Sequence, residues 1–83
     1  MTADTVYLMR RKEPQTRFQD LDRVRVTSAV STDDGDRILA GSEGTVVGVW
    51  RDGAAYEVEF AQPPGALATV NADDLALVAH AAP

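Results

Sequence analysis

Cysteine is absent from this chain of 83 residues. Its absence excludes disulfide bonds, thiolate metal sites and cysteine nucleophiles together. Small secreted domains usually depend on disulfides, so we expect a cytoplasmic protein. Apolar runs long enough to span a bilayer are also missing. The first basic residues follow the apolar patch Val6 to Met9, which reverses the order of a signal peptide. No membrane partner is therefore expected.

Residue types that support catalysis are scarce. The single histidine, His80, lies in a tail of small residues (79–83) without a predicted partner, and we interpret it as solvated. Catalysis needs a nucleophile with a base, a metal cluster or paired groups with shifted pKa values, and the sequence shows none of these patterns. The acidic loop of Asp33, Asp34 and Asp36 lacks the distal glutamate of a calcium-binding loop, so we interpret it as a turn. We therefore expect no enzyme, no metal and no cofactor.

The whole chain has a net charge of −5, and its positive charges are scarce after residue 17. Residues 1–17 hold four basic and two acidic side chains, whereas from Phe18 onward four arginines stand against eleven carboxylates, which gives −7. Such a body repels phosphate backbones, since nucleic-acid affinity comes largely from cationic groups that displace counterions. It suits steering toward a basic patch on another protein. The alternative is that the acidity only keeps a small domain soluble.

The chain is long enough for one domain, and its pattern predicts an all-β unit at residues 18–78. Residues 1–17 form an arm that is either disordered or adds Val6 to Met9 to a sheet edge, in this domain or in a second copy that makes a homo-oligomer. The polar segment after the first strand is expected to be irregular. Gly41 and Gly44 are expected to have positive φ. Strands are expected at 23–27, within 41–60 as a hairpin, at 66–70 and at 75–78, with a helical turn capped by Asn71 before the last.

The hairpin can be placed in register from its turn. Asp52-Gly53 predicts a two-residue type I′ turn, which sets Arg51 opposite Ala54. Because side chains alternate along a strand, each residue is then assigned to one face. The predicted inward face holds Val47, Val49, Tyr56, Val58 and Phe60, and the outward face holds Val46, Gly48, Trp50, Ala55, Glu57 and Glu59.

Trp50, the only tryptophan, falls on the outward face beside two glutamates. Leaving an indole exposed forgoes about 1.5–3 kcal/mol of burial, so the arm, a twin subunit or another protein should cover it. The alternative is that Trp50 plugs one end of the barrel. Arg23 and Arg25 could neutralise the glutamates, depending on strand order. Tryptophan is enriched at the centres of interfaces, so we predict a contact surface for a basic protein partner. Its residues are Trp50, Val46, Glu57, Glu59, Asp33, Asp34 and Asp36.

Five short strands, a long first loop, a tight hairpin and a helical turn before the last strand resemble an SH3-like barrel. Four motifs resemble those of a family of small uncharacterised bacterial proteins, a domain of unknown function. They are D-x-V-x-V at 22–26, A-G-x-x-G-T-V-V at 40–47, Y-E-V-E-F at 56–60 and an A-D-D-L ending within 68–75. The resemblance covers about three quarters of the chain. It implies pairing with a protein partner, for example as an antitoxin-like neutraliser.

Two other barrel families share parts of this pattern. "FQDLDRVRV", "GTVV" and "YEVEF" resemble the carboxyl-terminal barrel of nitrile hydratase β subunits and their activators, although Leu21 stands where that family has glycine. This resemblance implies an accessory role for a metalloenzyme. "EGTVVGV" resembles KOW-type barrels that bind RNA or ribosomes. Those modules use basic loops, whereas the loops here read "STDDGD", "RDG" and "NADD".

Overall fold

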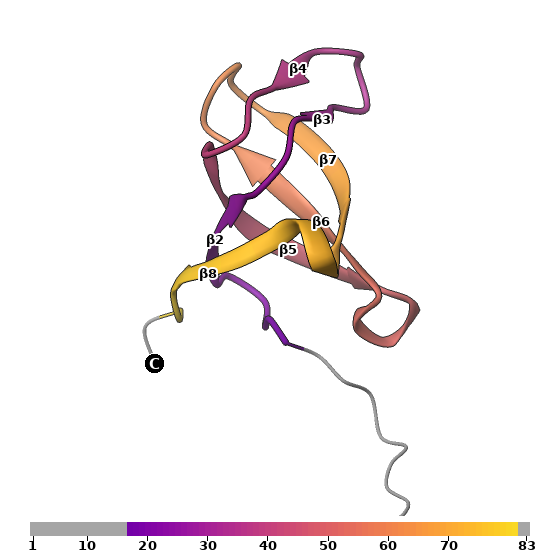
Figure 1. Cartoon of the computed structure of the whole chain (residues 1–83), viewed down its shortest axis with the longest axis vertical. Helices are drawn as coiled ribbons and strands as arrows, with labels where there is room; N and C mark the ends of the chain where they lie inside the picture. Colours follow the sequence, from indigo (N-terminus) through magenta and orange to yellow (C-terminus); the bar gives the residue numbers. More distant parts are fainter. Residues whose placement is uncertain (1–16, 82–83) are drawn as a thin grey trace, which may run out of the picture.

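The structure, a computed structural model, describes residues 17–81 and is almost entirely β, with two single helical turns (Figure 1). The all-β class predicted from the sequence is confirmed. The predicted sheet contribution of Val6 to Met9 lies outside the described residues. In chain order the elements are β2 (Arg23–Val26), β3 (Val30–Ser31), β4 (Arg37–Ile38), β5 (Glu43–Trp50), η2 (Arg51–Gly53), β6 (Ala55–Phe60), β7 (Ala66–Asn71), η3 (Ala72–Asp74) and β8 (Leu75–Ala79).

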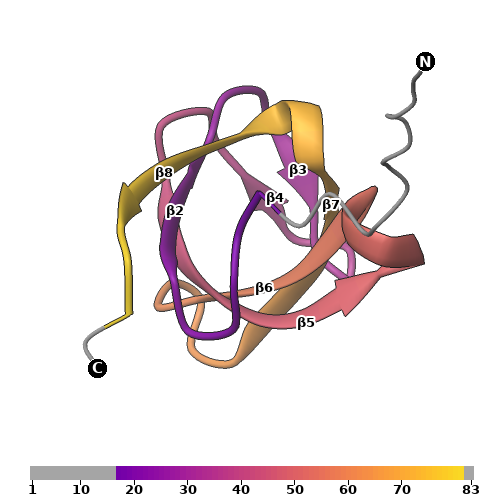
Figure 2. The same cartoon turned by 90° about the horizontal axis from the view of Figure 1, so that it is seen from below.

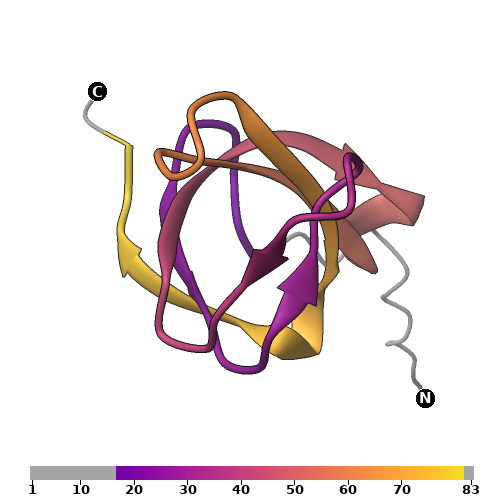
Figure 3. The same cartoon turned by 90° about the horizontal axis from the view of Figure 1, so that it is seen from above.

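Five strands form one antiparallel sheet in the order β7-β6-β5-β2-β8. The sheet curls on itself, so that the views along its axis show an open ring of strands (Figure 2 and Figure 3). The first strand of the sheet therefore lies between the second and the last. This order keeps β2 away from β6 and decides which charged side chains can meet across the sheet.

The core fills the interior of the curled sheet. Val24 and Val26 of β2 are fully buried and Arg23 and Arg25 are exposed, as the alternation predicts. Phe18 closes part of the core by packing edge-on against Tyr56, with 5.1 Å between ring centroids. The buried cluster comprises Phe18, Val24, Val26, Ile38, Val46, Tyr56, Val58, Phe60, Ala66, Ala68, Val70, Ala72 and Leu75.

The segment between β2 and β5, which the sequence predicted to be irregular, contains a small hairpin of β3 and β4. Val30 pairs with Ile38, and burial of Ile38 in the core gives this hairpin a reason to form. The Thr32 hydroxyl accepts the Asp36 N–H at 2.9 Å and closes the turn between the strands. The prediction of irregular structure for residues 28–37 was therefore wrong at Val30, Ser31 and Arg37.

A β-bulge in β5 overturns part of the predicted hairpin register. Near the turn the pairs Trp50–Ala55 and Gly48–Glu57 form as predicted, but Val46 pairs with Val58 because Val47 is an extra residue in β5. Val46, predicted to face outward, is consequently buried. Val47 and Val49, predicted to face the core, are 39% and 45% exposed. A bulge bends a strand and increases its twist, which β5 needs to follow the curl of the sheet.

The hairpin turn matches its prediction at the centre and differs at its flanks. The Ala54 N–H donates to the Arg51 carbonyl at 3.2 Å, around Asp52 and Gly53 with φ of 59° and 98°. These are the left-handed values that a type I′ turn requires. Arg51 also has positive φ, 51°, so the expected extended pair of Arg51 and Ala54 does not form. The ladder ends one residue earlier than predicted.

Two local predictions also need correction. Asn71 precedes η3 but its side chain makes no capping hydrogen bond. Gly41 has the predicted positive φ of 92°, whereas Gly44 is not left-handed and is required for space. A Cβ atom on Gly44 would lie 2.7 Å from Val58 Cγ1 and 2.8 Å from the Glu59 carbonyl oxygen. Gly44 thus permits the close approach of β5 to β6.

Asp22 ties the two ends of the described chain together. Its carboxylate is buried and accepts the backbone N–H groups of Gln19 and Ala81, each at 2.9 Å. His80, for which no partner was predicted, places Nδ1 3.5 Å from the same carboxylate. The Gln19 N–H contributes most to lowering the pKa of Asp22, and burial opposes it. The C-terminal residues are therefore held against the turn that precedes β2.

Candidate protein-binding surface

An apolar strip runs along the outer side of β5. Trp50 is 54% exposed at the end of this strand, as predicted, so it does not plug the barrel. Val47 joins it because it is the extra residue of the bulge, and Val49, which keeps its predicted partner Tyr56, is also 45% exposed. Three large apolar side chains in one short strand are thus left partly open to solvent.

An acidic hollow of about 460 Å³ lies beside this strip, lined by Val47, Gly48, Val49, Trp50, Glu57, Thr69 and Asp33. The Thr69 hydroxyl, on β7, donates to Glu57 Oε1 at 2.7 Å and orients that carboxylate. The Asp33 N–H donates to the Leu67 carbonyl at 2.8 Å, which holds the β3–β4 turn against β7. Loss of hydration and then the negative charge of Glu57 raise the pKa of Asp33. The two carboxylates therefore share one end of the hollow.

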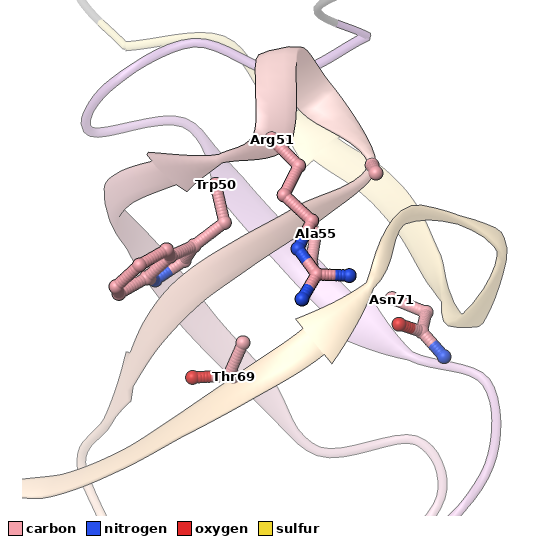
Figure 4. A pocket seen from close by; sticks show the side chains of 6 residues that line it. Trp50, Arg51, Ala55, Thr69 and Asn71 are labelled. Atoms are coloured by element: carbon pink, nitrogen blue, oxygen red, sulfur yellow. The ribbon is translucent and has the colours of Figure 1, made fainter.

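A second hollow of about 370 Å³ adjoins the first, because Trp50 and Thr69 line both. Its remaining lining comes from Arg51, Ala54, Ala55 and Asn71. Figure 4 shows the Arg51 guanidinium reaching back over β6, with Trp50 to one side and the β7 residues Thr69 and Asn71 across the hollow. The positive φ of Arg51 turns the chain in this way. The positively charged guanidinium of Arg51 therefore lies at one end of the second hollow.

The structure brings together three of the seven predicted contact residues, Trp50, Glu57 and Asp33, in the acidic hollow. Glu59 is exposed two positions along β6 from Glu57. The predicted contact of Val46 is wrong, because its side chain is buried. Asp34 and Asp36 are exposed on the β3–β4 turn but line neither hollow.

Strand order also decides the charge of this face. Arg23 and Arg25 both pair with Glu43, at 2.8 and 3.2 Å, because β2 neighbours β5 and not β6. Within residues 17–81, neither Glu57 nor Glu59 forms an ion pair. The acidic side chains next to Trp50 thus keep their negative charge uncompensated over the part of the chain that is described.

Sequence reasoning missed several lining residues. Thr69 alternates with the buried Ala68 and Val70, and this alternation was a usable signal for an outward position on β7. Arg51 gave no such signal, because a left-handed arginine is uncommon. Val47 was assigned to the core because the sequence does not mark the bulge, and Val49 is exposed although it keeps its predicted partner Tyr56.

Residues 20–76 match the model of the family described as "Domain of unknown function (DUF4926)". The chain belongs to this family. The DUF4926 match includes every residue that lines the two hollows. No match to a curated protein or to a solved structure was found.

Two features are absent from the described part of this DUF4926 chain. Residues 17–81 contain no group of three or more histidine, aspartate or glutamate side chains placed to hold a metal ion. No helix among these residues has the length and apolar character needed to cross a membrane.

Proposed function

We propose that this DUF4926 chain is a non-catalytic cytoplasmic interaction module that binds a basic surface of another protein. The observation that carries the proposal is the half-exposed indole of Trp50 in one hollow with the carboxylates of Glu57 and Asp33. An antitoxin-like neutraliser would use such a surface to cover a basic region that its partner needs for activity. The curled sheet, of the SH3-like kind, serves as a rigid support.

The energetics of this surface favour a partner with exposed lysine or arginine. Covering an exposed indole contributes about 1.5–3 kcal/mol, which makes Trp50 the natural anchor. A cation over its ring adds roughly 0.5–2 kcal/mol. The uncompensated carboxylates at the edge of the hollow speed the encounter with a basic partner and discriminate against acidic ones.

The test is affinity capture from the host with three tagged forms of the chain: wild type, Trp50→Ala and Leu39→Ala. Leu39 is a matched control, because it is 64% exposed and lines neither hollow. We expect wild type and Leu39→Ala to retain the same basic protein at moderate salt. With that partner purified, Trp50→Ala should bind about 30-fold more weakly, as expected for an anchor worth about 2 kcal/mol. Unchanged binding by a folded Trp50→Ala variant would overturn the proposal.

A further inference from the structure

The two adjoining hollows end in opposite charges, with Arg51 in one and Glu57 and Asp33 in the other. We propose that they form one polar groove for an extended peptide segment that carries a basic side chain and, two residues away, an acidic one. This inference rests on the proposed function, which requires only a basic partner. The inference adds that the groove also binds an acidic side chain and therefore selects the direction in which the segment lies.

The spacing of the two ends fits an extended peptide. Ala55 lies in the hollow with Arg51, and Glu57 lies in the other hollow, two residues along the same strand. At about 3.4 Å per residue, this separation is roughly 7 Å. In an extended peptide, side chains i and i+2 project from one side at the same spacing. A segment of the form Arg-x-Glu or Glu-x-Arg lying along β6 would thus place one charge at each end.

The groove does not neutralise its own charges within the described residues. Arg51 and Glu57 form no ion pair with each other or with any other residue in 17–81. Glu57 is held by the Thr69 hydroxyl, and the nearby charge of Glu57 raises the pKa of Asp33. A cation bound between these carboxylates would relieve their mutual repulsion. Trp50 lines both hollows, so its ring can contact the aliphatic part and the charged group of the same basic side chain.

The turn supports a role for Arg51. Arg51 has a positive φ of 51°, which non-glycine residues rarely adopt and which the type I′ turn at Asp52 and Gly53 does not require. Such backbone geometry clusters at binding sites, where it positions a side chain for use. Here the Arg51 side chain lies over β6 (Figure 4), so a residue with positive φ supplies the positive end of the groove.

The test uses four capped heptapeptides with glycine flanks and the centres Arg-Ala-Glu, Glu-Ala-Arg, Arg-Ala-Arg and Glu-Ala-Glu. Each is titrated to millimolar concentration into the full chain, with backbone amide NMR and the fluorescence of its only tryptophan as readouts. We expect one of the two mixed peptides to bind at least tenfold more tightly than Arg-Ala-Arg. Its amide shifts should map to β5, β6 and β7, and Glu-Ala-Glu should not bind.

Two charge-reversed variants sharpen the result. Arg51→Glu should transfer the preference to Arg-Ala-Arg by about tenfold, whereas Arg37→Glu, the same charge change at an exposed position of β4, should leave the order of affinities unchanged. If Arg-Ala-Arg binds wild type as tightly as both mixed peptides and needs Trp50, the polar groove is wrong and the proposed function stands. If no peptide shifts the amide signals of β5 to β7, the proposed peptide groove is wrong. The proposed function is then tested separately by the affinity capture of the partner.

Discussion

Asp22 and Trp50 reverse the usual relation between side-chain chemistry and burial. Carboxylates are seldom fully buried unless they are paired or hydrogen-bonded, yet Asp22 is 1% exposed. Its two backbone N–H donors supply the required compensation. Trp50 is open to solvent in a chain that has few aromatic residues to spare. The burial of Asp22 is thus explained within the fold, whereas the exposed Trp50 is the residue that the proposed partner would cover.

Stability should depend on the ionisation of Asp22. Replacement by Asn should lower the free energy of unfolding by about 2 kcal/mol at pH 7, since hydrogen bonds to a buried charge are lost. The pKa of Asp22 is lowered from its ordinary 3.8, so the folded state binds the proton less readily than the unfolded state. The contribution is therefore complete above about pH 5 and is lost as the pH falls through the folded pKa. Urea unfolding at pH 7 and pH 3, followed by circular dichroism, measures the difference.

His80→Ala is the matched control for this experiment. The His80 side chain is 72% exposed, so its contact with Asp22 should contribute less than about 0.5 kcal/mol. A loss for His80→Ala as large as that for Asp22→Asn would contradict the assignment of the stabilisation to the backbone donors. A gap between wild type and Asp22→Asn that is as wide at pH 3 as at pH 7 would contradict the role of the charge.

At the scale of the element, the bulge in β5 determines which valine side chains of the hairpin are buried and which are exposed. One extra residue moves Val46 into the core and leaves Val47 outside, near Val49 and Trp50. The contribution of Val47 to the apolar strip of the candidate surface is therefore a consequence of the bulge. The turn has a similar effect, because its left-handed residues aim Arg51 over the sheet.

Alanine replacements at two adjacent valines test the bulge. Val46→Ala should lower the free energy of unfolding by about 2 kcal/mol, because two buried methyl groups are lost and a cavity remains. Val47→Ala should change it by less than about 0.5 kcal/mol, since its side chain is 39% exposed. Chemical denaturation of both variants gives the comparison. The regular register predicted from the sequence demands the opposite order, with the larger loss at Val47.

For the whole molecule, the dominant feature is the excess of negative charge. From Phe18 onward the chain carries eleven carboxylates against four arginines. Of those four, Arg23 and Arg25 are both used by Glu43. The charge that remains repels itself across a small barrel and destabilises the compact state, while it attracts basic partners.

Added salt should therefore stabilise this protein at neutral pH. Raising NaCl from 10 to 150 mM shortens the screening length from about 30 to about 8 Å. We expect the thermal midpoint at pH 7 to rise by roughly 2–4 °C, equivalent to about 0.5 kcal/mol. The same step at pH 4.5, near the isoelectric point, should have no such effect. Equal shifts at both pH values would show that the salt acts by another route than self-repulsion.

The sequence by itself determined the all-β class, the alternation of β2, the Asp52-Gly53 turn and the outward position of Trp50. Each depends on interactions between residues that are close along the chain, such as φ preferences and the two-residue period of a strand. The excess of acid was likewise readable from the sequence, since composition does not depend on folding.

Only the tertiary structure decided the bulge at Val47, the partners of Arg23 and Arg25, the burial of Asp22 and the meeting of Asp33 with Glu57. These features depend on how the sheet curls and on which strands become neighbours, and both follow from long-range packing of the whole core. Consecutive valines such as Val46 and Val47 fit either face of a strand, so the local pattern cannot show where a bulge exchanges the two faces.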